Sequence, residues 1–139
     1  YALVDPIIKR EAVATMGSRL RLKQNIWAGG KKYIFYLRNY IGVFLMNFLT
    51  NWLYWQNATD YWGCYKAFRA DILKSIPNEA DGFPFDNELV CKLLRKGYSL
   101  KEVPIHYYPR SYEEGKKVKV SDGLKSLWTI IKWRFLPLD

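Results

Sequence analysis

The chain has 139 residues, half of them hydrophobic, so it is long enough to form one domain with a buried core. Lysine and arginine number 22 against 13 acidic residues, and the net charge of +9 favours an anionic partner such as a nucleic acid, a phospholipid surface or a diphosphate. No serine-hydrolase triad pattern, P-loop or zinc motif occurs in the sequence. The two cysteines, Cys64 and Cys91, lie in apolar stretches, which predicts buried, reduced thiols.

The N-terminal quarter of the chain predicts a short helical segment, a strand and a basic loop. Residues 1–11 have the pattern of a helix end, interrupted by Pro6. The apolar run 12–16, which ends at Gly17, predicts a buried strand. The following loop, 18–32, carries five cations.

The longest apolar stretch predicts a helix over residues 33–56, with Arg38 as its single charged residue. Asn47, Thr50 and Asn51 follow a helical spacing and form a polar stripe on this apolar helix. Three interpretations stay open at this point: a transmembrane span, an amphipathic helix lying in the membrane interface, and a core helix. The 17% aromatic content independently favours a surface that contacts a ligand, a membrane or a partner.

The rest of the chain alternates between strands and helices, which indicates a mixed α/β domain. Pro104 predicts an edge or terminal position in the last strand, because proline cannot donate to a sheet ladder. Glu88 falls in the first turn of a predicted helix, where an acidic residue interacts favourably with the helix dipole. In chain order we expect a strand over 62–69, a short helix over 71–76, a helix over 85–96 ended by Gly97, a strand over 98–105, a polar loop over 112–120 and an amphipathic helix over 121–136.

Two arginines stand where a phosphate could bind. Arg19 directly follows Gly17 and Ser18 at the end of a predicted strand, and its guanidinium could fork onto phosphate oxygens. The alternative is a surface arginine in a basic loop. Arg38 lies early in an apolar helix and must be solvated, snorkelled or paired. On a membrane it would lie at headgroup depth, whereas snorkelling without a function is the alternative.

One acid and a late group of cations complete the candidates. Asp60 lies between the apolar helix and the next strand, where it could orient an acceptor, accept a proton, bind a sugar hydroxyl or simply form a turn. Arg110, Lys116 and Lys117 follow the last strand beside Gly115. They predict either a mobile loop that closes over a diphosphate or a solvated basic loop.

The order of these motifs carries more information than any one of them. They are Gly17-Ser18-Arg19, the helix arginine, Thr59-Asp60, the Cys64–Phe68 strand, the Phe85–Leu89 helix start, Gly97-Tyr98, Glu102–Ile105, Arg110 and the Asp122-Gly123 helix with Trp128. This set resembles family 2 glycosyltransferases of the polyprenyl-phosphate, dolichol-phosphate mannose synthase-like type. The resemblance runs through nearly the whole chain.

The resemblance implies a GT-A-like mixed sheet with flanking helices. Residues 1–139 would be the acceptor-side, C-terminal half of one such domain, incomplete without its N-terminal nucleotide-binding half. The full-length enzyme would move a sugar from a nucleotide sugar, of the GDP-mannose or UDP-glucose type, to a polyprenyl phosphate lipid. It would work at the cytoplasmic face of a membrane, peripheral or anchored, with Mg²⁺ or Mn²⁺ as cofactor. The Asp-x-Asp ligands of that cation are absent from this sequence, so the fragment alone is expected to be inactive.

The resemblance also assigns roles to six residues. Arg19 and Arg38 would bind the acceptor phosphate, and Asp60 would assist its attack on the sugar. The donor diphosphate would be bound by Arg110, Lys116 and Lys117. One departure from a relative's pattern is Gly42, which stands where a serine is expected. The rival interpretation is a basic membrane-surface or nucleic-acid-binding module without catalysis, whereas the glycosyltransferase interpretation predicts no nucleic-acid partner.

Overall fold

A computed structural model describes residues 1–22, 33–82, 84–107 and 120–138, with the backbone alone for 33–39. The described chain is a mixed α/β structure. Its elements in chain order are α1 (Asp5–Ile8), β1 (Ala14–Ser18), α2 (Tyr33–Tyr54), β2 (Lys66–Phe68), α3 (Ala70–Lys74), α4 (Pro84–Arg95), β3 (Lys101–Pro104) and α5 (Val120–Phe135). The predicted element types are confirmed in their order. The main difference is β2, which pairs over three residues where a longer strand was expected.

The sheet has the strand order β2-β1-β3, with β1 in the centre. Strand β1 pairs with β2 in antiparallel and with β3 in parallel orientation, so that Met16 lies opposite Lys66 on one side and Glu102 on the other. The edge position predicted for β3 from Pro104 is confirmed. Because β1 and β3 are parallel, their C-terminal ends lie side by side, and the residues that follow Ser18 and Pro104 leave the sheet at the same end.

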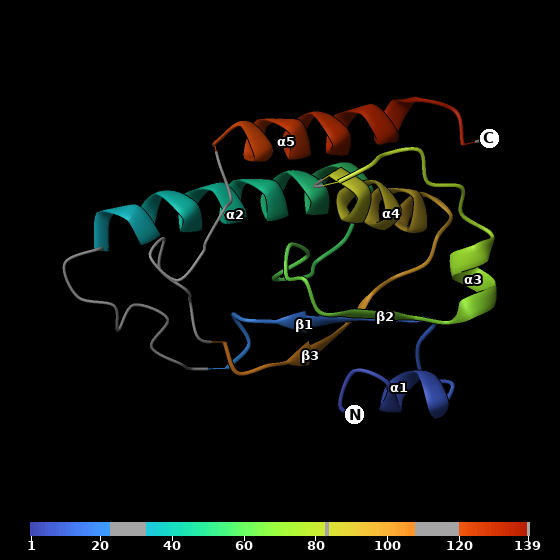
Figure 1. Ribbon diagram of the computed structural model, residues 1–139. Helices are drawn as coiled ribbons and strands as arrows, with labels where there is room; N and C mark the ends of the chain where they lie inside the picture. Colours follow the sequence, from blue (N-terminus) through green and yellow to red (C-terminus); the bar gives the residue numbers. More distant parts are fainter. Residues whose placement is uncertain (23–32, 83, 108–119, 139) are drawn as a thin grey trace.

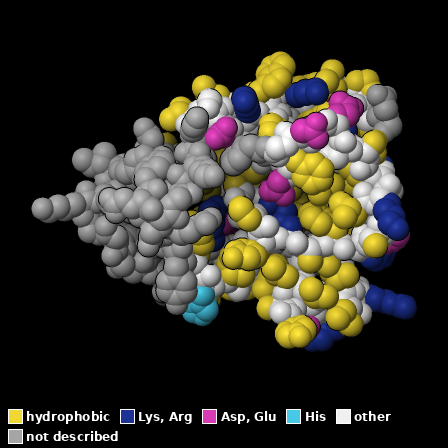
Figure 2. Space-filling view, in the orientation of Figure 1, with side chains coloured by type: hydrophobic (Ala, Val, Ile, Leu, Met, Phe, Trp, Pro, Cys, Tyr) yellow, Lys and Arg dark blue, Asp and Glu magenta, His cyan; other side chains and the backbone are white. Residues whose placement is uncertain are grey.

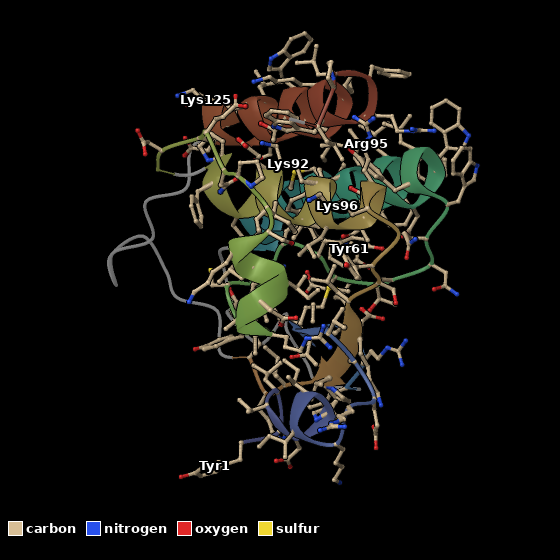
Figure 3. All side chains as sticks on the ribbon, turned by 90° about the vertical axis from the view of Figure 1, so that its right-hand side faces the viewer. Tyr1, Tyr61, Lys92, Arg95, Lys96 and Lys125 are labelled. Atoms are coloured by element: carbon tan, nitrogen blue, oxygen red, sulfur yellow. The ribbon has the colours of Figure 1, made fainter. Side chains whose placement is uncertain are left out.

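Helices α2, α4 and α5 form two layers over one face of the sheet, and α3 lies beside the sheet after β2 (Figure 1). Helices α2 and α4 lie above the strands, α5 lies outside them, and the short α1 lies on the opposite side against β1. The core lies between the sheet and the helices, and Tyr61 is placed there, below α4, in Figure 3. Its buried members are Ala14, Met16, Tyr54, Tyr61, Val90, Cys91, Leu94, Leu100, Ile130 and Trp133.

Helix α5 packs on α4 through Ile130 and Trp133, which belong to the core, and through polar contacts beside them. Ser126 is buried and accepts a hydrogen bond from Asn87 Nδ2 at 2.5 Å. Arg95 donates to the backbone oxygens of Trp133 and Leu136, and thereby satisfies carbonyls at the C-terminal end of α5. Figure 3 shows Lys92 and Arg95 between these two helices. The other side of α5 carries exposed apolar residues, among them Leu124, Trp128 and Phe135.

The cysteines divide between core and surface. Burial raises the pKa of the Cys91 thiol to about 12, so Cys91 remains a neutral core residue, as expected. The prediction for Cys64 is wrong, because this thiol is exposed. It belongs to the segment before β2, which the sequence predicted as strand and which lies here as an irregular turn.

Candidate functional site

The candidate site lies where the chain leaves β1, and its centre is an ion pair between Arg19 and Asp60. The Arg19 guanidinium binds the carboxylate with two short contacts, from Nε to Oδ2 and from Nη2 to Oδ1, both 2.6 Å. The backbone N–H of Arg19 also donates to Oδ2 at 3.0 Å. The Asp60 side chain is fully buried, whereas that of Arg19 is 20% exposed. The two residues that the sequence singled out separately are therefore bound to each other.

A tyrosine from the residues after β3 covers the Arg19 guanidinium. The ring centre of Tyr107 lies 5.2 Å from the guanidinium carbon. Burial alone would lower the pKa of Arg19, but the hydrogen bonds and charge of Asp60 outweigh it with a contribution from Tyr107, so this pKa is raised. Arg19 is thus held as a permanent cation with a defined orientation.

A second carboxylate, Glu102 on β3, holds the turn that carries Asp60. Its Oε1 accepts hydrogen bonds from Thr59 N at 2.7 Å, Thr59 Oγ1 at 2.6 Å and Asp60 N at 3.0 Å. Its other oxygen, Oε2, pairs with Arg21 at 2.8 Å. The Glu102 side chain is only 3% exposed. No role was predicted for Glu102, although an acidic residue inside a strand was a signal that could have drawn attention to it.

The polar stripe of α2 holds the same turn from the helix side. Asn47 donates to Thr59 O at 2.8 Å and accepts from Tyr61 N at 3.1 Å. One turn further along α2, Asn51 donates to Ala58 O at 2.8 Å and accepts from Ala58 N at 3.1 Å. Each amide thus binds backbone groups in both directions, as a neighbouring strand would. The stripe therefore faces the protein.

The opposite face of α2 is apolar and exposed, and the outer face of α5 is similar. On α2 and just beyond it, the exposed apolar residues are Ile41, Phe44, Leu45, Phe48, Trp52 and Trp55. On α5 they are Val120, Leu124, Trp128, Ile131 and Phe135. Figure 2 shows hydrophobic side chains with basic ones among them along the upper edge, where α5 lies. Exposed apolar patches of this size are typical of interaction surfaces, so α2 is not simply a core helix.

Trp55 has the most strained backbone of this surface. It follows the last residue of α2 with a φ of +51°, a conformation usually left to glycine at a helix end. Its indole is 81% exposed and lies under the Arg134 guanidinium, 4.7 Å from carbon to ring centre. No helix in the described ranges combines the length and hydropathy needed to cross a membrane, α2 included.

The remaining candidate cations fall outside the described side chains. Arg38 lies in the second turn of α2, where the structure describes the backbone alone. Arg110, Lys116 and Lys117 belong to the segment 108–119, which is not described. The described cluster therefore contains two arginines, Arg19 and Arg21, and each faces a carboxylate. An anion bound here would need further positive charge.

Glu88 has a structural environment in α4, and it lies in the second turn and not in the predicted first turn, because the helix begins at Pro84. Its carboxylate accepts from the N–H groups of Glu79 and Ala80, at 2.8 and 3.0 Å, and pairs with Lys92 at 2.7 Å. Burial alone would raise the pKa of Glu88, but these hydrogen bonds and the Lys92 charge outweigh it and lower that pKa. Lys92 in turn donates to Pro77 O, so the pair holds the loop before α4 in place.

The described residues show no cluster of metal-ligating side chains. In the part of the chain that the structure describes, no three His, Cys, Asp or Glu side chains converge as metal ligands. Asp60 and Glu102 are each bound to an arginine and do not form a donor set for a divalent cation. The chain matches no protein-family model, and no solved structure matches it significantly.

Proposed function

We propose that this chain is the acceptor-side part of a GT-A glycosyltransferase that transfers a sugar from a nucleotide sugar to a polyprenyl phosphate at a membrane surface. The order of the sequence motifs supports the family. The observation that carries the proposal is the orientation of α2. Its two amides face the protein and bind the turn of Asp60, while its apolar face is exposed. One helix thus joins an arginine-containing site to a surface suited to lipid.

The exposed faces of α2 and α5 suit the membrane interface. Both are rich in tryptophan and phenylalanine, which prefer the boundary between acyl chains and headgroups. The net charge of +9 adds attraction to anionic lipids. A polyprenyl chain could then remain in the bilayer while its phosphate reaches the end of β1. We propose that Arg38, early in α2, contacts that phosphate.

The proposed reaction depends more on neutralising and positioning charged groups than on a strong general base. A lipid phosphate is ionised at neutral pH and is itself the nucleophile, so neutralising and orienting it supplies most of the catalysis. In this proposal Arg19 binds acceptor oxygens and Asp60 orients Arg19. Arg110, Lys116 and Lys117 contact the donor diphosphate. A divalent cation, when bound elsewhere in the full-length enzyme, would neutralise that diphosphate.

The first test measures transfer by the full-length protein to a polyprenyl phosphate, with GDP- and UDP-sugars as donors. We expect Arg38→Ala to lose acceptor use by a factor equivalent to about 2–5 kcal/mol, as when one partner of a desolvated charge pair is removed. Arg69→Ala is the matched control, because Arg69 pairs with Asp71 on the surface, away from the site. Equal kinetics of the two variants would exclude Arg38 from the acceptor site.

The second test measures binding to vesicles of phosphatidylcholine with and without phosphatidylglycerol. Phe48→Ser and Trp128→Ser, on the exposed faces of α2 and α5, should each weaken binding. Leu73→Ser is the control, because Leu73 is exposed on α3 outside these faces. Salt-dependent binding to single-stranded nucleic acid with no affinity for vesicles would instead favour the nucleic-acid-binding alternative.

A further inference from the structure

The turn that carries Asp60 takes its position from side chains. Its residues pair with no strand, and the backbone groups of Thr59 bind Asn47 through the carbonyl and Glu102 through the N–H. Asp60 N also donates to Glu102 Oε1. A single carboxylate oxygen thus accepts two successive backbone amides of the turn, and this anchor belongs to the strand that pairs with β1.

The hydroxyl contacts of this cluster have only one consistent direction. The single proton of Thr59 Oγ1 points to the Glu102 carboxylate, which accepts it at 2.6 Å while its other oxygen faces Arg21. Ser18 Oγ therefore donates to Thr59 Oγ1 across 2.8 Å. The resulting chain, from Ser18 through Thr59 to Glu102, connects the end of β1, the Asp60 turn and β3.

We propose that Glu102 is a positioning residue that holds Asp60 against Arg19. The proposal rests on the proposed function, in which Arg19 binds the acceptor phosphate. Arg19 follows Ser18 directly, so the Ser18–Thr59–Glu102 chain sets the separation between the strand that carries Arg19 and the turn that carries Asp60. Without an acceptor oxygen of residue 102 facing the turn, the amides of Thr59 and Asp60 lose their common acceptor. The turn then moves, and the guanidinium loses its fixed orientation.

The decisive variant is Glu102→Gln in the full-length protein. Glutamine has the same shape, but its NH₂ group must face either the three donors of the turn or Arg21. In both orientations two hydrogen-bond donors face each other, and no hydrogen bond forms between them. Glu11→Gln is the matched control. Glu11 pairs at 2.6 Å with Lys101, the neighbour of Glu102 on β3, but on the exposed surface. The two variants remove the same charge from the same region of the molecule.

The primary readout is the side-chain Nε–H resonance of Arg19 in ¹⁵N NMR, with its rate of exchange with water. In Glu102→Gln we expect the resonance to shift and exchange at least about tenfold faster, and the KM for polyprenyl phosphate to rise about tenfold to a hundredfold with a smaller change in kcat. Glu11→Gln should leave both readouts unchanged. Thr59→Val, which replaces the hydroxyl with a methyl group and leaves Glu102 in place, should change them in the same direction by less, and it carries the test if Glu102→Gln does not fold.

An Arg19 resonance and exchange rate that stay at their wild-type values in a folded Glu102→Gln or Thr59→Val variant would overturn the proposal. A changed resonance in a protein whose wild type transfers no sugar would support the positioning contact and refute the proposed function. A changed resonance with an unaltered KM would overturn the link between Glu102 and acceptor binding. The NMR and kinetic readouts thus separate failure of this inference from failure of the glycosyltransferase assignment.

Discussion

Removal of the Asp60 charge should be among the most damaging substitutions in this protein. The Asp60 side chain is fully buried, and its two oxygens accept three hydrogen bonds from Arg19. Asp60→Asn keeps the size of the side chain but leaves Arg19, whose side chain is four-fifths buried, without its counter-charge. Breaking a buried pair in this way costs about 3–5 kcal/mol. Because a domain has about 5–15 kcal/mol of stability, this loss is a large fraction of the total.

The assay is urea unfolding followed by circular dichroism, arranged as a double-mutant cycle. With a slope of about 1–3 kcal/mol per molar urea, the midpoint of Asp60→Asn should fall by about 2 M. Arg19→Met should cost a similar amount, because it leaves the buried carboxylate unpaired. The double variant should cost less than the sum of the two by about 1–3 kcal/mol, since neither charge is then left alone.

A matched control for this cycle lies on the surface. Arg69 binds Asp71 with the same bidentate geometry, at 2.6 and 2.8 Å, but both side chains are more than half exposed. Asp71→Asn should therefore change the midpoint very little, because solvent screens an exposed pair. If Asp60→Asn were as mild as this control, or if the Arg19 and Asp60 effects were additive, the pair would not be buried in solution and the argument from it would fail.

The remaining predictions concern a buried carboxylate and two glycines. The pKa of Glu88 is lowered in the folded protein. Its contribution to stability is therefore present above the ordinary pKa of about 4.5 and is lost as the pH falls through the folded-state pKa. The free energy of unfolding should thus decrease less steeply with falling pH in Glu88→Gln than in the wild type. Gly63→Ala should cost about 1–3 kcal/mol and disturb the turn before β2, because its Cβ would lie 2.9 Å from Gly17 O; an unchanged urea midpoint would contradict that close approach. Gly123→Ala, in the first turns of α5 with open space around its Cβ, should instead raise stability by up to about 1 kcal/mol in the same assay.

Much of the fold could be predicted because its signals are local. The apolar run before Gly17 indicated β1, and Gly97, which has a φ of +83°, indicated the end of α4. Pro104 placed β3 at an edge for a purely covalent reason, its missing N–H. Such features depend on a few neighbouring residues, so the sequence contains all that is needed to predict them.

The site was only half predictable, for the opposite reason. Arg19 and Asp60 could each be singled out, but no local pattern says that residues 41 positions apart bind each other. The role of Glu102 escaped notice, since it follows from the parallel pairing of β3 with β1 and from a turn more than 40 residues away. Sequence spacing does not encode such contacts, because they form only when three separate segments pack together.

The two stripes of α2 show most clearly where the sequence stops and the tertiary structure begins. The sequence by itself determined a long helix with Asn47 and Asn51 on one line and apolar residues around the rest. It did not determine which side would face the protein. A transmembrane span, a helix in the membrane interface and a core helix all remained possible. The tertiary structure decided this, because the backbone groups of residues 58–61 need hydrogen-bond partners and the two amides supply them. The same side of the helix adds Tyr54 to the core. The polar stripe is therefore buried and the apolar face is left outside.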